Sequence, residues 1–160
     1  MPVLRLKEFL NQHHTAFTTI VHSTTYTAQG TAAVAHVPGK ELAKTVIVNA
    51  DGCLAMAVLP ANKQLDLALF RSMMGAQSIA LATEEEFDRA FPDCELGAMP
   101  PFGNLYGMDV IADETLAQDK EIAFNACSHR ELIRLAWEDF ERLAKPKIAR
   151  FAARAAVDAA

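Results

Sequence analysis

Two features of the sequence have residue types that could act on a substrate: a lysine at the start of an apolar segment, and a loop rich in glycine and proline. Lys44 leads directly into Thr45-Val46-Ile47-Val48, a segment that is expected to be buried. Because a buried charge without a partner is costly, this ammonium group must either extend to water or face a cleft. Residues 97–103 contain two glycines and two prolines, which exclude a regular helix or strand. Such a rigid turn is either a sharp connection or a scaffold that directs backbone N–H groups at a bound carbonyl.

Other patterns that would carry chemistry are missing or have a simpler structural explanation. The sequence has no G-x-S-x-G segment, no H-E-x-x-H pair and no glycine-rich phosphate loop, which disfavours serine hydrolases, zinc peptidases and nucleotide-binding proteins. Glu84-Glu85-Glu86 is typical of the solvated first turn of a helix. Acidic neighbours on both sides of Cys94 disfavour a thiolate nucleophile at that position. No metal and no cofactor are expected.

The composition predicts one globular domain that acts in the cytoplasm. A chain of 160 residues corresponds to about one domain, and its 51% hydrophobic residues can build a core without staples. A net charge of −5 disfavours a surface that coats nucleic acid but allows a local basic patch. Three cysteines without C-x-x-C spacing argue against a disulfide framework or a zinc site and favour a reducing compartment. The sequence shows neither the apolar stretch of a signal peptide nor a run long enough to span a membrane.

The pattern of apolar residues and turn signals predicts interleaved strands and helices. Asp51-Gly52 lies between two apolar runs and is the strongest hairpin signal in the chain. Strands are expected over 16–21, 45–48, 54–59, 78–81, 108–111 and 122–125, and helices over 4–14, 28–36 and 65–74. These elements predict a mixed α+β domain with a single mixed sheet, or a partly closed barrel, and helices packed around it.

The ends of the helices are marked by capping residues. Thr27 is expected to cap the helix over 28–36, and Thr83 with Glu86 forms a capping box. Residues 128–143 fit either a single helix or a last strand followed by a helix that begins at Trp137.

Five short motifs, in order and at similar spacing, resemble the YbaK/aminoacyl-tRNA synthetase-associated domain family, which includes free-standing deacylases and the editing domain of bacterial prolyl-tRNA synthetases. The chain looks closest to the small stand-alone members, because it carries a Thr27-Ala28-Gln29 helix start. The resemblance covers about residues 4–145, so we expect an editing domain over 1–145 and a basic, alanine-rich C-terminal tail or helix over 146–160. The motifs are Ala43–Val48, Ala57–Ala61, Phe91–Gly97, Pro100–Gly103 and Ser128-His129.

The resemblance implies hydrolysis of the ester that joins a wrong amino acid to the terminal adenosine of a tRNA. It implies that Lys44 is essential and that the loop from Gly97 through Pro100 and Pro101 positions the scissile carbonyl. Water would attack, with help from a ribose hydroxyl of the substrate, and no side-chain nucleophile is needed. The resemblance also implies that substrate-binding residues line the pocket, and we expect these to be Tyr26, Thr45, Ser128 and His129.

Two residues depart from the family pattern. Cys127 stands where many relatives have glycine, and we expect it to narrow or re-angle the pocket beside Ser128 and His129. Gly30 stands where a glutamate often completes the cap at Thr27, and we expect it to weaken the start of that helix.

A cluster of positive charge near the C-terminus could contact tRNA. Five of the fifteen lysines and arginines lie there, and apolar residues are interleaved at helical spacing. The segment is therefore expected to form an amphipathic helix whose basic face is either simply solvated or assists binding of the acceptor stem. The basic residues are Arg142, Lys145, Lys147, Arg150 and Arg154.

The sequence thus predicts a trans-editing deacylase whose partner is aminoacyl-tRNA, most simply tRNA-Pro carrying alanine or another small amino acid. An aminoacyl-tRNA synthetase is a further possible partner. The alternative is a non-catalytic module with the same fold that binds aminoacyl-tRNA or a small ligand, because a fold alone does not establish activity.

Overall fold

The computed structural model describes residues 2–154 and confirms the mixed α+β class. Helices and strands alternate along the chain. The helices are α1 (Pro2–Gln12), α2 (Ala28–Ala35), α3 (Leu67–Met74), α4 (Glu84–Ala90) and α5 (Trp137–Ala144), with short 3-10 helices at Gly103–Leu105 and Glu114–Gln118. The strands are β1 (Thr18–Val21), β2 (Ala43–Ala50), β3 (Cys53–Pro60), β4 (Lys63–Leu65), β5 (Ile79–Leu81), β6 (Asp109–Asp113), β7 (Glu121–Asn125), β8 (Glu131–Ala136), β9 (Lys147–Ala149) and β10 (Ala152–Arg154).

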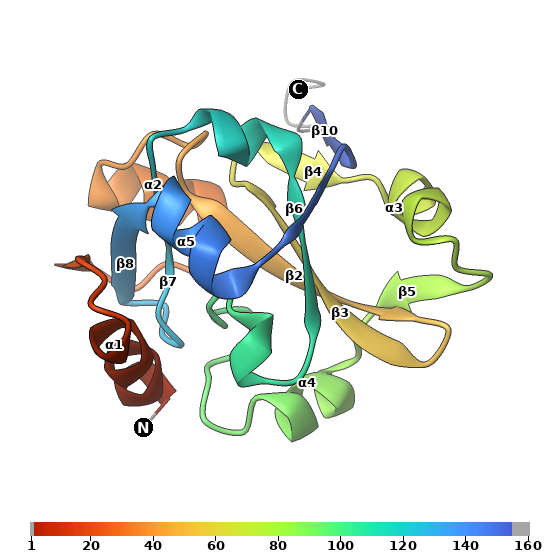
Figure 1. The fold of residues 1–160 in the computed structure, drawn as a ribbon, viewed down its shortest axis with the longest axis horizontal. Helices are drawn as coiled ribbons and strands as arrows, with labels where there is room; N and C mark the ends of the chain where they lie inside the picture. The colour runs from red at the N-terminus through yellow and green to blue at the C-terminus, as the bar shows by residue number, and fades with distance from the viewer. Residues whose placement is uncertain (1, 155–160) are drawn as a thin grey trace.

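The strands form three sheets among the described residues, so the expectation of a single sheet is wrong, and the partly closed barrel is not found there. A five-stranded sheet has the order β5-β2-β3-β6-β9, a three-stranded sheet the order β1-β8-β7, and β10 pairs with β4. The long β2–β3 hairpin runs through the middle of the molecule, and α1 lies on the side of β8 and β7 (Figure 1). The five-stranded and three-stranded sheets are joined by an isolated parallel bridge between Leu42, which precedes β2, and Ala123 of β7.

The predicted hairpin between β2 and β3 is confirmed. Ala50 pairs with Cys53, and the two turn residues Asp51 and Gly52 both have positive φ, 51° and 90°. Paired strands with a two-residue turn of this conformation are the arrangement that Asp-Gly favours. The Asp51 carboxylate also accepts the backbone N–H groups of Gln77 and Ser78, which fixes the turn against β5.

The two faces of β2 are buried in different cores. Ala43 and Ile47 belong to the larger core, which includes Phe102, whereas Val48 belongs to a smaller core with Phe70 and Phe151. Because side chains alternate along a strand, Lys44 lies on the Val48 face and Thr45 on the Ile47 face. The two neighbouring candidate residues therefore point to opposite sides of the sheet.

The two predicted N-caps, Thr27 and Thr83, are confirmed, whereas the helices predicted over 4–14 and 65–74 lie at Pro2–Gln12 and Leu67–Met74. Thr27 caps α2 by accepting the N–H of Gly30 at 3.0 Å. A side chain at Gly30 would place its Cβ 2.7 Å from that hydroxyl, so glycine suits this position. Thr83 and Glu86 form the full capping box of α4.

The ambiguous segment before the C-terminus resolves into strand β8 followed by α5, which begins at Trp137 as the second interpretation predicted. None of the helices within residues 2–154 has the length and apolar character needed to cross a membrane.

The helix expected over 146–160 is wrong for the part that the structure describes, and residues 155–160 lie outside the described residues. Residues 147–149 form β9, parallel to β6, and residues 152–154 form β10, antiparallel to β4. The buried carboxylate of Asp113 accepts the backbone N–H groups of Phe151 and Ala152 at 3.1 and 2.9 Å. The edges of β6 and β4 and the Asp113 carboxylate supply backbone partners in place of intrahelical ones, and the extended chain buries Phe151 in the smaller core, so tertiary contacts override the helical spacing of the apolar residues.

Candidate active site

Lys44 lines a pocket of about 320 Å³ between the start of α2, the end of the hairpin and β4. Lys44 pairs with Leu59, one residue from the open end of the β2–β3 ladder, so its backbone is fixed in a regular strand. The ammonium group is therefore carried by a rigid element and faces a cavity, which is one of the two possibilities that the sequence left open. The pocket is lined by Thr27, Ala28, Gln29, Lys44, Ala61, Lys63 and Gln64.

The lining of this pocket is positively charged. Burial lowers the pKa of Lys44 below its ordinary value of 10.5. Within residues 2–154, neither Lys44 nor Lys63 forms an ion pair with a carboxylate. The first backbone N–H groups of α2 add the partial positive charge of a helix N-terminus. Two cations and a helix start around one cavity suit an anionic or carbonyl-bearing ligand.

The loop predicted from its glycines and prolines begins with a tight turn. The N–H of Ala98 donates to the carbonyl of Glu95 at 3.0 Å, and Gly97 at the third position has a φ of 84°. Positive φ at this position is typical of a type II turn and favours glycine. Beyond the turn, Pro100 and Pro101 are buried. Only the first part of the loop therefore lies at the surface.

This turn is held against the segment that precedes β8. The Cys127 N–H donates to the Ala98 carbonyl at 2.8 Å, and the Glu95 N–H donates to the Cys127 carbonyl at 3.1 Å. The Glu95 carboxylate accepts the backbone N–H of His129 at 3.1 Å. We call the two segments, residues 94–98 and 127–129, the loop clamp.

A disulfide between Cys94 and Cys127 closes the loop clamp, which corrects the expectation drawn from the number and spacing of the cysteines. Spacing along the chain gave no signal because the two residues lie 33 positions apart. Cys127 has a φ of 66°, a conformation that glycine adopts without strain. The departure from the family's glycine therefore coincides with a cross-link that glycine could not make.

His129 supports the turn from inside the loop clamp. Its side chain is buried, and Nε2 lies 2.6 Å from the Leu96 carbonyl oxygen. A carbonyl only accepts, so Nε2 carries the proton of this hydrogen bond. The imidazole thus holds the residue next to Gly97 in place. Ser128 accepts the N–H of Arg130 through its hydroxyl at 3.1 Å.

The predicted site residues fall into two groups that the start of α2 connects. Tyr26 packs against His129, with 5.0 Å between ring centroids, and its neighbour Thr27 lines the Lys44 pocket. Thr45 does not line that pocket. Its hydroxyl is buried on the other face of β2 without a hydrogen-bond partner in the described structure.

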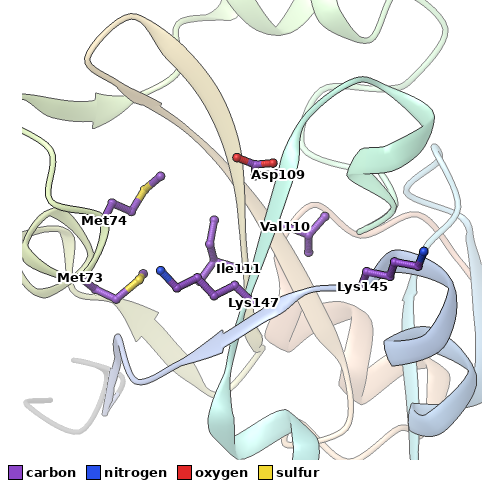
Figure 2. Close-up of a pocket in the computed structure, with 7 residues that line it drawn as sticks. All are labelled: Met73, Met74, Asp109, Val110, Ile111, Lys145 and Lys147. Carbon is purple, nitrogen blue, oxygen red and sulfur yellow. The ribbon is translucent and has the colours of Figure 1, made fainter.

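The basic residues near the C-terminus do not form one surface. Lys145 and Lys147 line a second cavity of about 340 Å³ beside Met73 and Met74. Figure 2 shows that Lys147 extends toward Met73, whereas the Lys145 ammonium group points away to the opposite side. Arg150 is exposed, and the side chain of Arg154 lies outside the described structure.

One of these basic positions nevertheless lies near the Lys44 pocket. The backbone of Arg154 in β10 pairs with Lys63 in β4, and Lys63 lines that pocket. The sequence analysis did not assign Lys63 or Glu95 to the site. Lys63 lines the Lys44 pocket and Glu95 binds the backbone of His129, and both roles depend on contacts between segments that are distant in the chain.

Comparison with known proteins agrees with this architecture. Residues 22–143 match the model of the aminoacyl-tRNA editing domain, and the chain belongs to this family. Among individual relatives, the chain is similar to the multifunctional Ser/Thr-tRNA deacylase ProXp-y of Escherichia coli strain K12. The two are 30% identical over 155 residues, which cover 92% of this chain and 90% of the relative. The same protein from Escherichia coli O157:H7 matches equally well.

Solved structures with low sequence identity share the fold. The hypothetical protein APE2540 superposes with a TM-score of 0.82 at 19% identity, over 92% of this chain and 99% of that one. A protein proposed to be a trans-editing enzyme for prolyl tRNA synthetase gives a TM-score of 0.81 at 19% identity, over 94% and 96% of the two chains. The predicted family resemblance is thus confirmed.

Proposed function

We propose that this protein is a free-standing deacylase that hydrolyses the ester bond of mischarged aminoacyl-tRNA in the cytoplasm. The observation that carries the proposal is Lys44, a half-buried ammonium group that faces a cavity and has no acidic partner among the described residues. An ammonium group with such surroundings stays available to bind the negatively charged 3′ end of a tRNA. Lys63 and the start of α2 add positive charge to the same cavity.

The turn at Gly97 supplies the second part of the proposed mechanism. A backbone without a side chain lets the ester carbonyl approach closely, and preorganised N–H groups stabilise the negative charge that develops on its oxygen. A water molecule attacks the carbonyl, and a ribose hydroxyl of the substrate assists it. The aminoacyl ester is already reactive, so orientation and modest electrostatic stabilisation are sufficient.

His129 acts in this mechanism as a positioning residue. Its Nε2 donates to Leu96 and its backbone N–H donates to Glu95, so it fixes both residues that precede Gly97. Because Nε2 uses its proton to bind the Leu96 carbonyl, His129 holds the turn in place without transferring a proton. Ser128 lies beside it and completes the wall of the site.

The identity of the amino acid that is removed has two candidates. The resemblance to prolyl-tRNA synthetase editing domains favours alanine or another small residue on tRNA-Pro. The relative at 30% identity is named a Ser/Thr-tRNA deacylase, which favours serine or threonine. A difference of one methyl or hydroxyl group changes binding by only about 1–3 kcal/mol in an apolar pocket, so a panel of substrates is required.

The decisive test is deacylation of a panel of tRNAs charged with alanine, serine, threonine, cysteine or 2-aminobutyrate. The proposal expects turnover of at least one substrate by the wild-type protein and its loss in Lys44→Ala. Binding of aminoacyl-tRNA without turnover of any substrate would instead identify the non-catalytic module. Uncharged tRNA and spontaneous ester hydrolysis serve as controls.

We also propose that basic residues beyond α5 assist binding of the acceptor stem. The register that places Arg154 opposite Lys63 brings this segment next to the Lys44 pocket. Truncation would remove Phe151 from the smaller core and so lower stability, and charge-neutral substitutions are therefore the suitable test. Arg150→Gln with Arg154→Gln is expected to weaken tRNA binding and to flatten its dependence on salt. An unchanged affinity and slope would exclude this role. Pull-down of a synthetase tests the further partner.

A further inference from the structure

Tyr26 has an exposure that packing does not explain. Its side chain is 77% exposed, whereas each of the other described phenylalanine, tyrosine and tryptophan side chains is buried or partly buried. A tyrosine ring that is open to solvent beside a candidate site has a free face on which a base or a partner can pack. The ring lies at the candidate site, 5.0 Å from the buried ring of His129.

The backbone around Tyr26 is anchored on both sides. The Thr25 N–H donates to the His129 carbonyl at 3.3 Å, and the Thr25 hydroxyl forms a hydrogen bond with Thr31. On the other side, Thr27 caps α2 through Gly30. The ring is therefore held in a defined place while most of its surface is open. Such preorganisation reduces the entropy that a stacking ligand would cost.

His129 links the ring of Tyr26 to the turn at Gly97. Leu96 is 51% exposed, and its carbonyl is bound by the same His129 that contacts Tyr26. A Cβ at Gly97 would lie 3.8 Å from His129 Cε1. The exposed ring and the turn that would hold the ester carbonyl therefore both lie beside the imidazole of His129.

We propose that Tyr26 is the stacking platform for the terminal adenine base of tRNA, which holds the 3′ nucleotide while its ester lies at Gly97. This inference rests on the proposed function, since it concerns the same substrate. Single-stranded RNA is commonly bound by stacking of its bases on aromatic side chains, and the unpaired 3′ end of tRNA is such a strand. Adenine is uncharged, which fits an aromatic ring that lies beside, rather than inside, the Lys44 pocket.

Binding is tested with uncharged tRNA that carries 2-aminopurine, a fluorescent adenine analogue, at its 3′ end. Stacking should quench the fluorescence with the wild-type protein and with Tyr26→Phe, which keeps the ring, but not with Tyr26→Ala. Val34→Ala is the matched control, because it removes an exposed apolar side chain from the nearby helix α2. It should quench the fluorescence as wild type does. Because Tyr26 is exposed, Tyr26→Ala should keep the wild-type melting temperature.

Kinetics give a second readout. Tyr26→Ala should raise KM for the charged tRNA about 5- to 150-fold and leave kcat nearly unchanged, the range expected for loss of one base stack. A charged tRNA with an abasic 3′ nucleotide should lose the same factor with wild type and nothing further with Tyr26→Ala. The inference would be overturned if Tyr26→Ala raised KM by the same factor for intact and for abasic tRNA. It would also be overturned if Tyr26→Ala quenched the fluorescence as strongly as wild type.

The outcome also separates this inference from the proposed function. Quenching does not require turnover, so quenching that depends on Tyr26 in a protein that hydrolyses no substrate would support the platform and refute the deacylase. Turnover with the same KM in wild type and in Tyr26→Ala would support the deacylase and refute the stacking platform. Loss of synthetase binding in Tyr26→Ala, with unchanged tRNA binding, would assign the ring to a protein interface and overturn the platform.

Discussion

The Lys44 pocket and the loop clamp are built in opposite ways. Lys44 is one side chain on a regular strand whose backbone pairs with β3, and it makes no ion pair in the described structure. The loop clamp has no regular secondary structure and is held by backbone hydrogen bonds, two side-chain contacts to or from His129 and a disulfide. The chemistry of the first region lies in a side-chain charge, and that of the second in the shape of a backbone.

This difference separates function from stability in one region and couples them in the other. A desolvated ammonium group does not stabilise the fold, so removing it should affect activity alone. The contacts of the loop clamp stabilise the same backbone that the proposed mechanism uses. Changes there should therefore lower both stability and activity.

The largest effect is expected for Lys44→Ala. Loss of the cation should lower kcat/KM at least about 100-fold, as is typical when a key electrostatic contact of a transition state is removed. The melting temperature should stay constant or rise, because the variant no longer buries part of a charge. Lys44→Arg, which keeps the charge, should retain more activity than Lys44→Ala. Full activity of Lys44→Ala would contradict the assignment of this pocket.

Gly97→Ala is expected to lower activity about 10-fold and stability by about 1 kcal/mol. The stability loss follows from the φ of 84°, since the new Cβ would make only an ordinary contact with His129. Gly75→Ala is a matched control, because Gly75 has a φ of 67° and open space around it at the end of α3. It should show a similar loss of stability in urea denaturation with normal deacylation. Equal activity losses in both variants would contradict a special role for Gly97.

Opening the disulfide should have a smaller effect on activity. Cys94→Ala is expected to reduce deacylation a few-fold and the free energy of unfolding by about 2–4 kcal/mol, because the cross-link closes a long segment of chain. Cys127→Gly also opens the disulfide but relieves the positive φ, so it should be about 1 kcal/mol more stable than Cys94→Ala. Cys53→Ala, at the exposed free cysteine, is the control and should behave as wild type.

Reduction of the wild-type protein offers an independent check. A dithiol reductant should reproduce the activity loss of Cys94→Ala and leave that variant unaffected. Equal sensitivity of the two proteins to the reductant would show that the disulfide does not support the loop clamp.

The smallest effect is expected in the pH dependence. The pKa of Lys44 is lowered by burial, so its charge is lost as pH rises through a value below 10.5. The charge-dependent part of kcat/KM, after subtraction of spontaneous hydrolysis, should therefore fall at lower pH than for an exposed lysine. Folding shows the opposite sign, since the unfolded chain binds more protons in this window and stability due to Lys44 rises with pH.

Lys44→Arg provides the control for this fall of kcat/KM at alkaline pH. Arginine stays protonated throughout the range, so its residual activity should not show the alkaline decline. If kcat/KM declined at the same pH in wild type and in Lys44→Arg, the decline would belong to the titration of another group.

The sequence alone was sufficient for features that depend on residues a few positions apart. Asp51-Gly52 specified a two-residue turn, and the caps at Thr27 and Thr83 act on N–H groups three residues later. The family resemblance, which rests on ordered motifs, also identified Lys44 as a candidate. These features could be predicted because their partners lie within the same short stretch of chain.

Tertiary structure decided which distant segments meet. The segment after α5 has helical spacing but forms strands, because the edges of β6 and β4 and the carboxylate of Asp113 bind its backbone. Likewise, only the fold brings Lys63 to the Lys44 pocket and joins Cys94 to Cys127. Local sequence patterns do not predict such contacts. Each contact closes a loop of tens of residues and needs a partner surface that exists only after the sheets have formed.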